Sequence, residues 1–536
     1  MQKEQKKLLK EDLLDNGMVA EVLPKYITTM GISQLCLIPK LSISKDTEPS
    51  TINLPKNDGN VRQIYLPNPV AYIEAVDMLC KSNILEKILT KIEKNKFSHS
   101  KLIYDDGLFN IPVKNHSSKF AESQREKMFL SIGKKYAVRY DIEKFYDSIY
   151  THYLPAGLIG FENAINMYRG VISPSKEYMD MCNIEKAMTR LCRGETKGIV
   201  TGPYISRILS ELLQSEIDKE IFEKIGNDKF RRFVDDTTLY VNSVVDGEKD
   251  LREIKKIFQK YKLSLKMEKT DIIEFPYLDF TTIRDLLKFR KIKNTSKENW
   301  YFASQDDFFE NIDKAEEISN GGNHKGVLKY LFKTLANTNY EYGIGKKYSD
   351  KDISFSYLVN YISKYPQYAQ FISEILDRNI NNIENIEDVL NDTLKLFIDS
   401  EYEIAVLHIF GVLVKHRFYI DKDFLISYIE NEDANDIVAA VFAQYLCEKN
   451  FEEFYERLNE VKKKLYVGGE IDFKTNNWLL KYVFFLFGII TDVECNQDNY
   501  YRYFLNWKNN NYKFINFDVL SHNEKENKQE KILEMV

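Results

Sequence analysis

The sequence predicts an α+β fold in its first half and an all-α fold in its second half. Strand and helix patterns alternate between residues 136 and 290, whereas beyond residue 311 apolar residues recur almost only at helical spacing. The chain has 536 residues, of which 44% are hydrophobic, and this is enough to form roughly two or three packed units. We expect a mixed region at 1–135, an alternating region at 136–290, a linker at 291–310 and a helical region at 311–536.

Local patterns predict the elements of the first half. Alternating residues in NVRQIYLPNP (60–69) predict a short strand that the prolines end. A strand that turns helical after Asp141 is predicted for YAVRYDIEKFYDSI (136–149). Apolar residues at helical spacing predict two helices, in GPYISRILSELLQSEIDKEIF (202–222) and REIKKIFQKYKLSL (252–265).

Between these two helices, the stretch RRFVDDTTLY (231–240) places Asp235 and Asp236 between two β-prone runs. This pattern predicts two strands joined by a tight turn with the acids at its tip. Two like charges at one turn repel each other, and a bound cation is one reason to keep them together. The alternative is a solvated turn, which is the natural interpretation of the Asp-Asp pair at 105–106, before Gly107.

Asp141 supports the cation interpretation, because it ends a predicted strand 94 residues before Asp235. An acid in that place can meet a hairpin tip on a neighbouring strand. Three converging carboxylates could bind two Mg²⁺ ions about 4 Å apart, which would activate a hydroxyl and stabilise leaving pyrophosphate. No His or Cys cluster accompanies the acids, which suits Mg²⁺, with Mn²⁺ as an alternative ion.

The second half contains a weak internal repeat. YEIAVLHIFGVLVKHRF (402–418) and NDIVAAVFAQYLCEKNF (435–451) align with an offset of 33 residues. A stack of helical hairpins is the simplest architecture for this pattern, because each pair buries its apolar stripe on the next. An irregular helical domain without true repeats is the alternative.

Composition excludes several classes of protein. The six cysteines have no paired spacing, which argues against a disulfide framework or a zinc site and favours a cytoplasmic location. The first 17 residues are charged throughout and lack the apolar core of a secretion signal. The longest apolar run, YVFFLFGII (482–490), has nine residues, whereas a membrane helix needs about 20. We therefore expect a buried helix there and no membrane partner.

Charge is distributed unevenly along the chain. Residues 1–300 carry 49 Lys and Arg against 42 Asp and Glu, whereas the remaining 236 residues carry 26 against 39. Residues 251–300 alone hold 13 basic and 7 acidic residues. Such a local excess can follow a phosphate backbone, although a solvated helix face explains it equally well.

Four segments in order resemble the palm motifs of reverse transcriptases: DIEKFYDSI (141–149), KGIVTGPYISRILSELL (197–213), RRFVDDTTLY (231–240) and KLSLKMEKT (262–270). With the upstream VRQIYLPNPVAYIEAV (61–76) and the long helical half, the chain is similar to the abortive-infection (AbiK-like) group of bacterial reverse transcriptases. The resemblance implies fingers at 1–135, a palm at 136–290 and a HEAT-like helical-repeat domain at 311–536 in place of a thumb.

The resemblance also implies roles for the acids and for one lysine. Asp141 and Asp235 would bind the metal ions, and Asp236 would be a further ligand or tune the charge of its neighbour. Lys269 matches the basic residue that can neutralise or protonate leaving pyrophosphate.

Other positions match nucleotide-binding residues. Tyr146 matches the aromatic residue beneath the incoming sugar, where a bulky ring clashes with a 2′-hydroxyl. Gly198 and Gly202 would let backbone approach the nucleotide or template closely. Ser206, one turn into the following helix, is also expected to bind the nucleotide. Arg62 is a candidate clamp for the triphosphate.

The implied function is a DNA polymerase of anti-phage defence that uses dNTPs and makes single-stranded DNA without a template, attached to a priming tyrosine. Tyr26 is an early candidate for that tyrosine, and a homo-oligomer is expected. The loop Gly-Ile-Val-Thr-Gly lacks the usual proline between its glycines, which puts ordinary template handling in doubt. A templated, retron-type enzyme that copies an RNA and a non-catalytic scaffold with a decayed palm are the alternatives.

Overall fold

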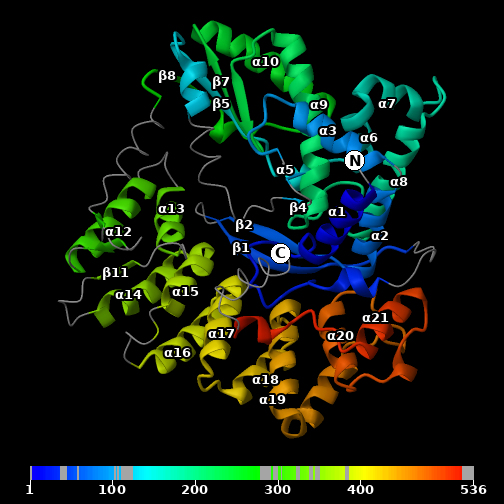
Figure 1. Cartoon of the computed structure of the whole chain (residues 1–536), viewed down its shortest axis with the longest axis vertical. Helices are drawn as coiled ribbons and strands as arrows, with labels where there is room; N and C mark the ends of the chain where they lie inside the picture. Colours follow the sequence, from blue (N-terminus) through cyan, green and yellow to red (C-terminus); the bar gives the residue numbers. More distant parts are fainter. Residues whose placement is uncertain are drawn as a thin grey trace.

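In the computed structural model, a small antiparallel sheet with helices on one face lies beside a long array of helices (Figure 1). The structure describes the following residues: 3–36, 45–56, 60–81, 83–101, 104–105, 108–109, 125–277, 291–293, 300–302, 305–320, 326–336, 342–344, 351–378, 380 and 385–521.

The sheet has four strands in the order β6-β7-β5-β8, and every neighbouring pair is antiparallel. Their bounds are β5 (Tyr136–Tyr140), β6 (Phe230–Phe233), β7 (Asp236–Val241) and β8 (Asp271–Glu274). The predicted hairpin at 231–240 is therefore confirmed. So is the predicted strand before Asp141, although the helix after it, α5 (Phe145–Ser148), is a single turn.

One face of the sheet is buried under two helices, α9 (Tyr204–Ile225) and α10 (Val244–Lys260). Val138 and Leu239 point to this face and belong to the main core. Gly247 of α10 lets the helix lie close, since a Cβ there would be 3.0 Å from Val138. On the other face, Ala137 and Tyr240 form a separate small cluster with Tyr277. The hairpin tip with the acids lies at the end of this layer.

The remaining elements of the first half surround the sheet and α9 (Figure 1). The predicted strand at 60–69 is β2, which pairs with β1 in a hairpin. Strand β1 packs on α17 (Glu403–His416) and α19 (Asp436–Lys463) of the helical half. The bounds are α1 (Lys3–Asn16), β1 (Ser50–Pro55), β2 (Val61–Leu66), α2 (Pro69–Cys80), α3 (Ile84–Lys94), β3 (Tyr104–Asp105), β4 (Leu108–Phe109), α6 (Leu154–Ile159), α7 (Phe161–Tyr168) and α8 (Lys176–Arg190).

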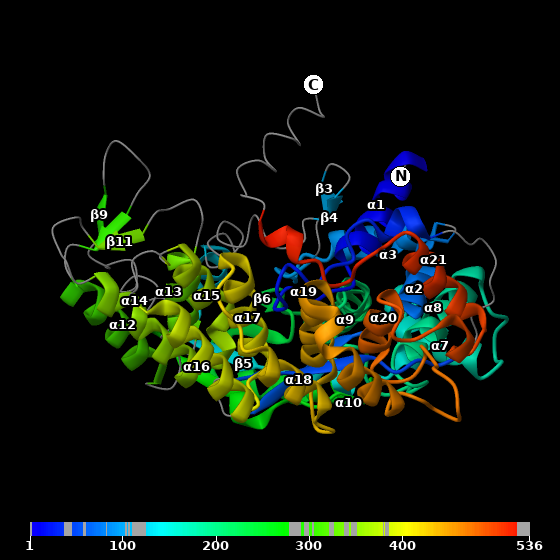
Figure 2. The same cartoon turned by 90° about the horizontal axis from the view of Figure 1, so that it is seen from below.

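The second half is mainly helical, as predicted, and its helices lie side by side along the molecule (Figure 2). The bounds are β9 (Lys291–Lys293), β10 (Trp300–Phe302), α12 (Gln305–Asn320), α13 (Gly326–Leu335), β11 (Tyr342–Ile344), α14 (Lys351–Lys364), α15 (Ala369–Arg378), α16 (Ile386–Asp399), α17 (Glu403–His416), α18 (Lys422–Glu430), α19 (Asp436–Lys463), α20 (Trp478–Leu486) and α21 (Asn499–Asn509). Because α12 begins at Gln305, the helices start inside the predicted linker.

Two predictions for the helical half have different outcomes. Residues 482–486 of the apolar run lie in a buried helix, α20, as predicted, whereas residues 487–490 follow the end of that helix. No helix in the described part of the chain is long and apolar enough to cross a membrane. The two segments of the internal repeat are α17 and α19, but α17 has 14 residues and α19 has 28. These unequal lengths do not correspond to a regular repeat, and a HEAT-like repeat stays a prediction.

The segment after α1 joins the two halves. Ile27 pairs with Ile515, and Thr28 N donates to Phe514 O at 2.8 Å. Tyr26 is 0% exposed, and its hydroxyl donates to Leu407 O of α17 at 2.7 Å. This conformation does not support the prediction of Tyr26 as the priming residue, because its phenol is enclosed between the halves.

Candidate active site

The two acids of the β6–β7 hairpin lie at its tip. Phe233 pairs with Asp236, and Val234 and Asp235 form the turn between them; we call residues 233–236 the acidic turn. Val234 has a φ of 56°, a left-handed conformation that is rare for a β-branched residue. Its N–H donates to the Ser100 hydroxyl at 2.8 Å, and its carbonyl accepts from Arg232 Nη1 at 2.9 Å. These two bonds hold the turn that carries Asp235.

Asp141 lies beside the acidic turn because β5 pairs with β7. The register places Tyr140 opposite Thr237, so Asp141 and Asp236 follow at the next opposed positions. Asp141 is 4% exposed, and its carbonyl accepts from Lys266 N at 2.8 Å. The structure thus brings together three acids that the sequence separates by 94 residues.

Burial and the nearby carboxylates raise the pKa values of Asp235 and Asp236. Burial raises the pKa of Asp235 to about 7, and the charges of Asp141 and Asp236 add to the effect. Desolvation also raises the pKa of Asp236, with a contribution from Asp141, while nearby cations led by Lys269 oppose the shift. Acids that disfavour the charge of one another gain most from a bound cation.

The ammonium group of Lys269 neutralises Asp141. Its Nζ lies 2.5 Å from Asp141 Oδ2, at the end of the short 3-10 helix Met267–Lys269. Burial alone would lower the pKa of Lys269, but the bond to Asp141 raises it above its ordinary value. Asp141 Oδ1 is buried, and within the described residues it has no hydrogen-bond partner.

This arrangement suits a divalent cation in its chemistry. Carboxylate oxygens are the ligands that Mg²⁺ prefers, and Asp141 offers a buried oxygen without a partner. Among the described residues, however, no group of three or more His, Cys, Asp or Glu side chains is arranged to hold a metal ion. Asp141 and Asp235 are the residues that would hold one, in competition with Lys269 for Asp141.

Tyr146 lies near these acids, in α5. Its ring packs on Phe145 with centroids 5.3 Å apart, and its phenol bonds to Ser210 of α9. The charge of Asp235 is among those that raise its pKa, after burial as the main cause. The structure therefore places this aromatic ring at the edge of the site, half-buried.

The glycine loop lies between α5 and β2. Gly198 and Gly202 have φ values of 92° and 129°, which favour glycine. Gly198 N donates to Ile149 O at 2.8 Å, and a Cβ at Gly202 would be 3.1 Å from Tyr65 O. Both glycines thus bring the loop against protein backbone, and their contact with a nucleotide stays a prediction.

Two further predicted residues do not join the acids. Ser206 is 0% exposed, and its hydroxyl has no partner in the described part of the chain; it faces the core, so a contact with a nucleotide is not supported. Arg62 is exposed on β2 and lies within electrostatic range of Lys329 in α13. The fingers arginine is therefore close to the helical half, a neighbour that the sequence did not suggest.

Two residues behind the acidic turn were missed from the sequence. Arg232 shares a sheet face with Phe230 of the core, and an arginine at a core-facing position of a strand is a signal of a buried ion pair. Ser100 lies 134 residues before Val234 in sequence, and nothing in its local pattern points to the turn.

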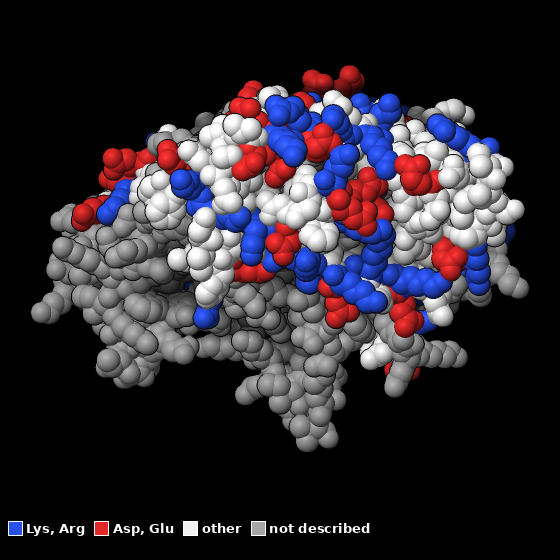
Figure 3. Space-filling model, turned by 90° about the horizontal axis from the view of Figure 1, so that it is seen from above, with Lys and Arg blue, Asp and Glu red and all other residues white. Residues whose placement is uncertain are grey.

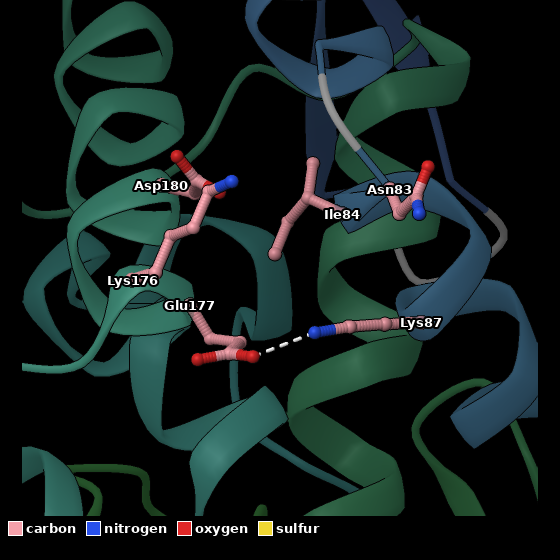
Figure 4. A pocket seen from close by; sticks show the side chains of 6 residues that line it. All are labelled: Asn83, Ile84, Lys87, Lys176, Glu177 and Asp180. Carbon is pink, nitrogen blue, oxygen red and sulfur yellow. Dashed lines mark hydrogen bonds and ion pairs between the residues drawn. The ribbon is translucent and has the colours of Figure 1, made fainter.

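A surface pocket of about 280 Å³ lies elsewhere, between α3 and α8 (Figure 4). Asn83, Ile84 and Lys87 line one side, and Lys176, Glu177 and Asp180 line the other. Lys87 Nζ pairs with Glu177 Oε1 across it at 2.6 Å. It contains none of the acids of the hairpin or their neighbours.

The basic run at 251–300 forms a mixed surface where the structure describes it. Figure 3 shows Lys and Arg spread over the face that carries α10, with Asp and Glu between them. Lys256 pairs with Glu253 at 2.6 Å, and Lys260 pairs with Glu220 at 3.1 Å. These cations therefore have acidic partners, which favours the solvated helix face over a nucleic-acid track.

Comparison with known families identifies the region that contains the site. Residues 54–282 match the family model described as "Reverse transcriptase (RNA-dependent DNA polymerase)". The match includes the acids, Lys269, Tyr146 and the glycine loop, so this part of the chain is a reverse transcriptase domain. No curated protein matches the sequence.

The solved structures that match this chain include telomerases of two Candida species. Apo telomerase of Candida tropicalis is 14% identical over 71% of this chain and 68% of its own, with a TM-score of 0.31. A version truncated from the C-terminal domain is 14% identical over 44% of this chain and 52% of its own, with a TM-score of 0.30. Telomerase of Candida albicans in complex with a telomeric RNA fragment is 13% identical over 81% of this chain and 64% of its own, with a TM-score of 0.29. This chain thus spans between half and about two thirds of their length.

Proposed function

Because residues 54–282 form a reverse transcriptase domain, we propose that the protein is a DNA polymerase of this type that uses dNTPs and Mg²⁺. One observation carries the proposal: Asp141 of β5 meets Asp235 and Asp236 of the hairpin tip at one end of the sheet. The raised pKa values of Asp235 and Asp236 and the unpartnered oxygen of Asp141 support a site that binds divalent cations.

The residues of the chain have separate roles in this proposal. Bound Mg²⁺ would supply Lewis acidity to the attacking hydroxyl and the leaving pyrophosphate. Asp141 and Asp235 would hold the ions, and Asp236 would be a further ligand or tune the charge of its neighbour. Lys269 neutralises or protonates the leaving pyrophosphate, and its ion pair with Asp141 supports that placement. Tyr146 excludes the 2′-hydroxyl of ribonucleotides.

We further propose that synthesis needs no template and serves bacterial anti-phage defence of the abortive-infection type. The unusual Gly-Ile-Val-Thr-Gly loop supports this, because both of its glycines lie against protein backbone, where a template would otherwise approach. The docking of β1 on α17 and α19 also supports it, since the helical half is held against the fingers. A tyrosine other than Tyr26 would prime the DNA. The active form would be a homo-oligomer in the cytoplasm, with the DNA attached to the protein.

The test is incubation of the pure protein with labelled dNTPs and Mg²⁺, with and without an RNA template and a primer. We expect DNA without either addition. Asp235→Asn and Asp236→Asn, singly and together, should abolish synthesis and leave the circular-dichroism spectrum unchanged, because they remove ligands without removing volume. DNA that forms only when RNA is present would instead indicate a templated enzyme of retron type.

Mass spectrometry of the purified protein tests the priming mode. Covalently attached deoxynucleotides on a tyrosine peptide would support protein priming and identify the residue. DNA that separates fully from the protein after denaturation would exclude it. Phage protection that survives the Asp235→Asn change unaltered would mean that catalysis is not the function.

A further inference from the structure

A group of buried polar side chains lies behind the acidic turn. We call Ser100, Glu211, Asp218 and Arg232 the support cluster; each is between 1% and 5% exposed. Arg232 comes from β6, Glu211 and Asp218 come from α9, and Ser100 comes from the segment after α3. Buried charges are costly unless they are paired and hydrogen-bonded, so this cluster needs a reason to exist.

Arg232 links α9 to the acidic turn. Its Nη2 lies 2.8 Å from Glu211 Oε1, and its Nε lies 3.0 Å from Asp218 Oδ2. Its Nη1 donates to the carbonyl of Val234 at 2.9 Å. The planar guanidinium therefore sets the position of the peptide group that joins Val234 to Asp235.

Ser100 holds the other side of the same residue. Its hydroxyl accepts from Val234 N at 2.8 Å and donates to Glu211 Oε2 at 3.2 Å. The backbone around Ser100 runs beside β6, because His99 N donates to Arg232 O and Arg232 N donates to Phe97 O, both at 2.8 Å. The N–H and the carbonyl of Val234 are thus both bound by one buried cluster.

This matters because the turn is strained. A valine at a φ of 56° adopts a conformation that its branched side chain disfavours. Such a conformation persists only where the surroundings hold it, and Asp235 is the next residue. We propose that Ser100, supported by Glu211 and Arg232, is a positioning residue that holds the acidic turn in the geometry with which Asp235 binds a divalent cation.

The inference rests on the proposed function, since it assumes that Asp235 is a metal ligand. It adds that a segment outside the palm motifs determines how well that ligand is placed. Groups that orient metal ligands are commonly worth about 10-fold to 100-fold in metal affinity. Ser100 is the suitable residue to change, because it carries no charge and its loss leaves the ion pairs of Arg232 in place.

The experiment measures Mn²⁺ binding to the full-length protein by electron paramagnetic resonance, without nucleotides. Asp235→Asn defines the binding that does not involve the site. We expect Ser100→Ala to weaken the Asp235-dependent binding about 10-fold. The matched control is Ser373→Ala, which removes a buried serine hydroxyl of α15 that donates to Gln370 O at 3.0 Å and has no bond to the support cluster. Its Mn²⁺ binding should stay within about 2-fold of the wild type. Circular dichroism verifies that each variant is folded.

A second variant separates positioning from general support of the fold. Val234→Gly relieves the strain, because glycine adopts positive φ freely. In the Val234→Gly protein, Ser100→Ala should weaken Mn²⁺ binding by clearly less than 10-fold. The double-mutant cycle should therefore show coupling between the two positions.

Each outcome has a definite meaning. Equal binding by Ser100→Ala and the wild type, equal losses in both serine variants, or additive effects in the cycle would each overturn the inference. If Asp235→Asn binds Mn²⁺ as well as the wild type does, the metal site of the proposed function fails instead.

Discussion

Lys269 and Asp141 form an ion pair of 2.5 Å at the centre of the acidic site. The lysine therefore competes with any divalent cation for Asp141 Oδ2. If it also neutralises pyrophosphate, as we propose, its two roles have opposite effects on metal binding and on catalysis.

Lys269→Ala should separate these effects. Mn²⁺ should bind the free protein more tightly, because the competing ammonium group is gone, whereas dNTP incorporation should slow about 10²-fold. Calorimetric titration and single-turnover kinetics measure the two quantities. Lys266→Ala, which changes a neighbouring lysine that lies 3.9 Å from Glu268, is the control. If Lys269→Ala lowered both the metal affinity and the rate of dNTP incorporation, Lys269 would not compete with the metal ion for Asp141.

The pKa of Asp235 predicts a pH-dependent effect on stability. Its folded value of about 7 lies above its ordinary value of 3.8, so the folded state binds a proton more tightly than the unfolded chain does. Stability from this group is present below the ordinary value and is lost as pH rises towards 7. In EDTA, Asp235→Asn should therefore raise the melting temperature at pH 8 and have little effect at pH 5.

The control for this prediction is Asp271→Asn, which changes an exposed acid of the same sheet. Its melting temperature relative to the wild type should not differ between the two pH values. An equal effect of Asp235→Asn at both pH values would mean that the carboxyl is not held protonated.

We predict that Tyr146 makes the enzyme prefer deoxynucleotides to ribonucleotides. Tyr146→Ala should raise the incorporation of ribonucleotides relative to deoxynucleotides by roughly 10-fold or more, because the ring no longer meets the 2′-hydroxyl. The ratio of kcat/KM for dGTP and GTP measures it. Tyr150→Ala, another half-buried tyrosine of this segment, should leave the ratio unchanged. A fall in both rates without a change in ratio would assign Tyr146 to the core.

We predict that Lys329 and Lys333 of α13, in the acidic half of the chain, contact a DNA strand. Burial and the charges of Lys333 and Arg62 lower the pKa of Lys329, with Glu21 opposing. Three cations from β2 and α13 thus lie together, which favours a phosphate backbone as their partner. Changing both lysines to Gln should reduce the salt slope of single-stranded DNA binding by about 2.

Fluorescence anisotropy with a labelled oligonucleotide measures this slope. Lys415→Gln is the control in the same half, since Lys415 pairs with Asp377 at 2.6 Å. A higher KM for dNTPs with unchanged DNA binding would assign the lysines to the triphosphate and not to the strand.

Tyr26 predicts a structural effect only. Tyr26→Phe removes the hydroxyl that donates to Leu407 O and should lower the free energy of unfolding by about 1–2 kcal/mol. DNA synthesis and any covalent attachment should persist. Denaturant unfolding and the polymerase assay are the measurements, and loss of attached DNA in a folded Tyr26→Phe protein would restore Tyr26 as the primer.

The residues of the acidic turn and of α9 were predictable because their patterns are local. Alternation of β-prone residues around Asp235 and Asp236 specifies a hairpin, and apolar spacing specifies a helix from Tyr204. The proximity of Asp141 to these two acids was also predictable. Asp141 ends a strand, and the end of a strand meets a hairpin tip when that strand pairs with a strand of the hairpin.

Only the tertiary structure decided which side chains surround these elements. Tyr26 is in the core because residues 381 positions later cover it, and Ser100 holds Val234 across 134 positions. Arg62 faces α13 for the same reason. Local patterns report the period of a strand or a helix, whereas partners at such separations depend on how whole elements pack, and no short stretch of sequence contains that information.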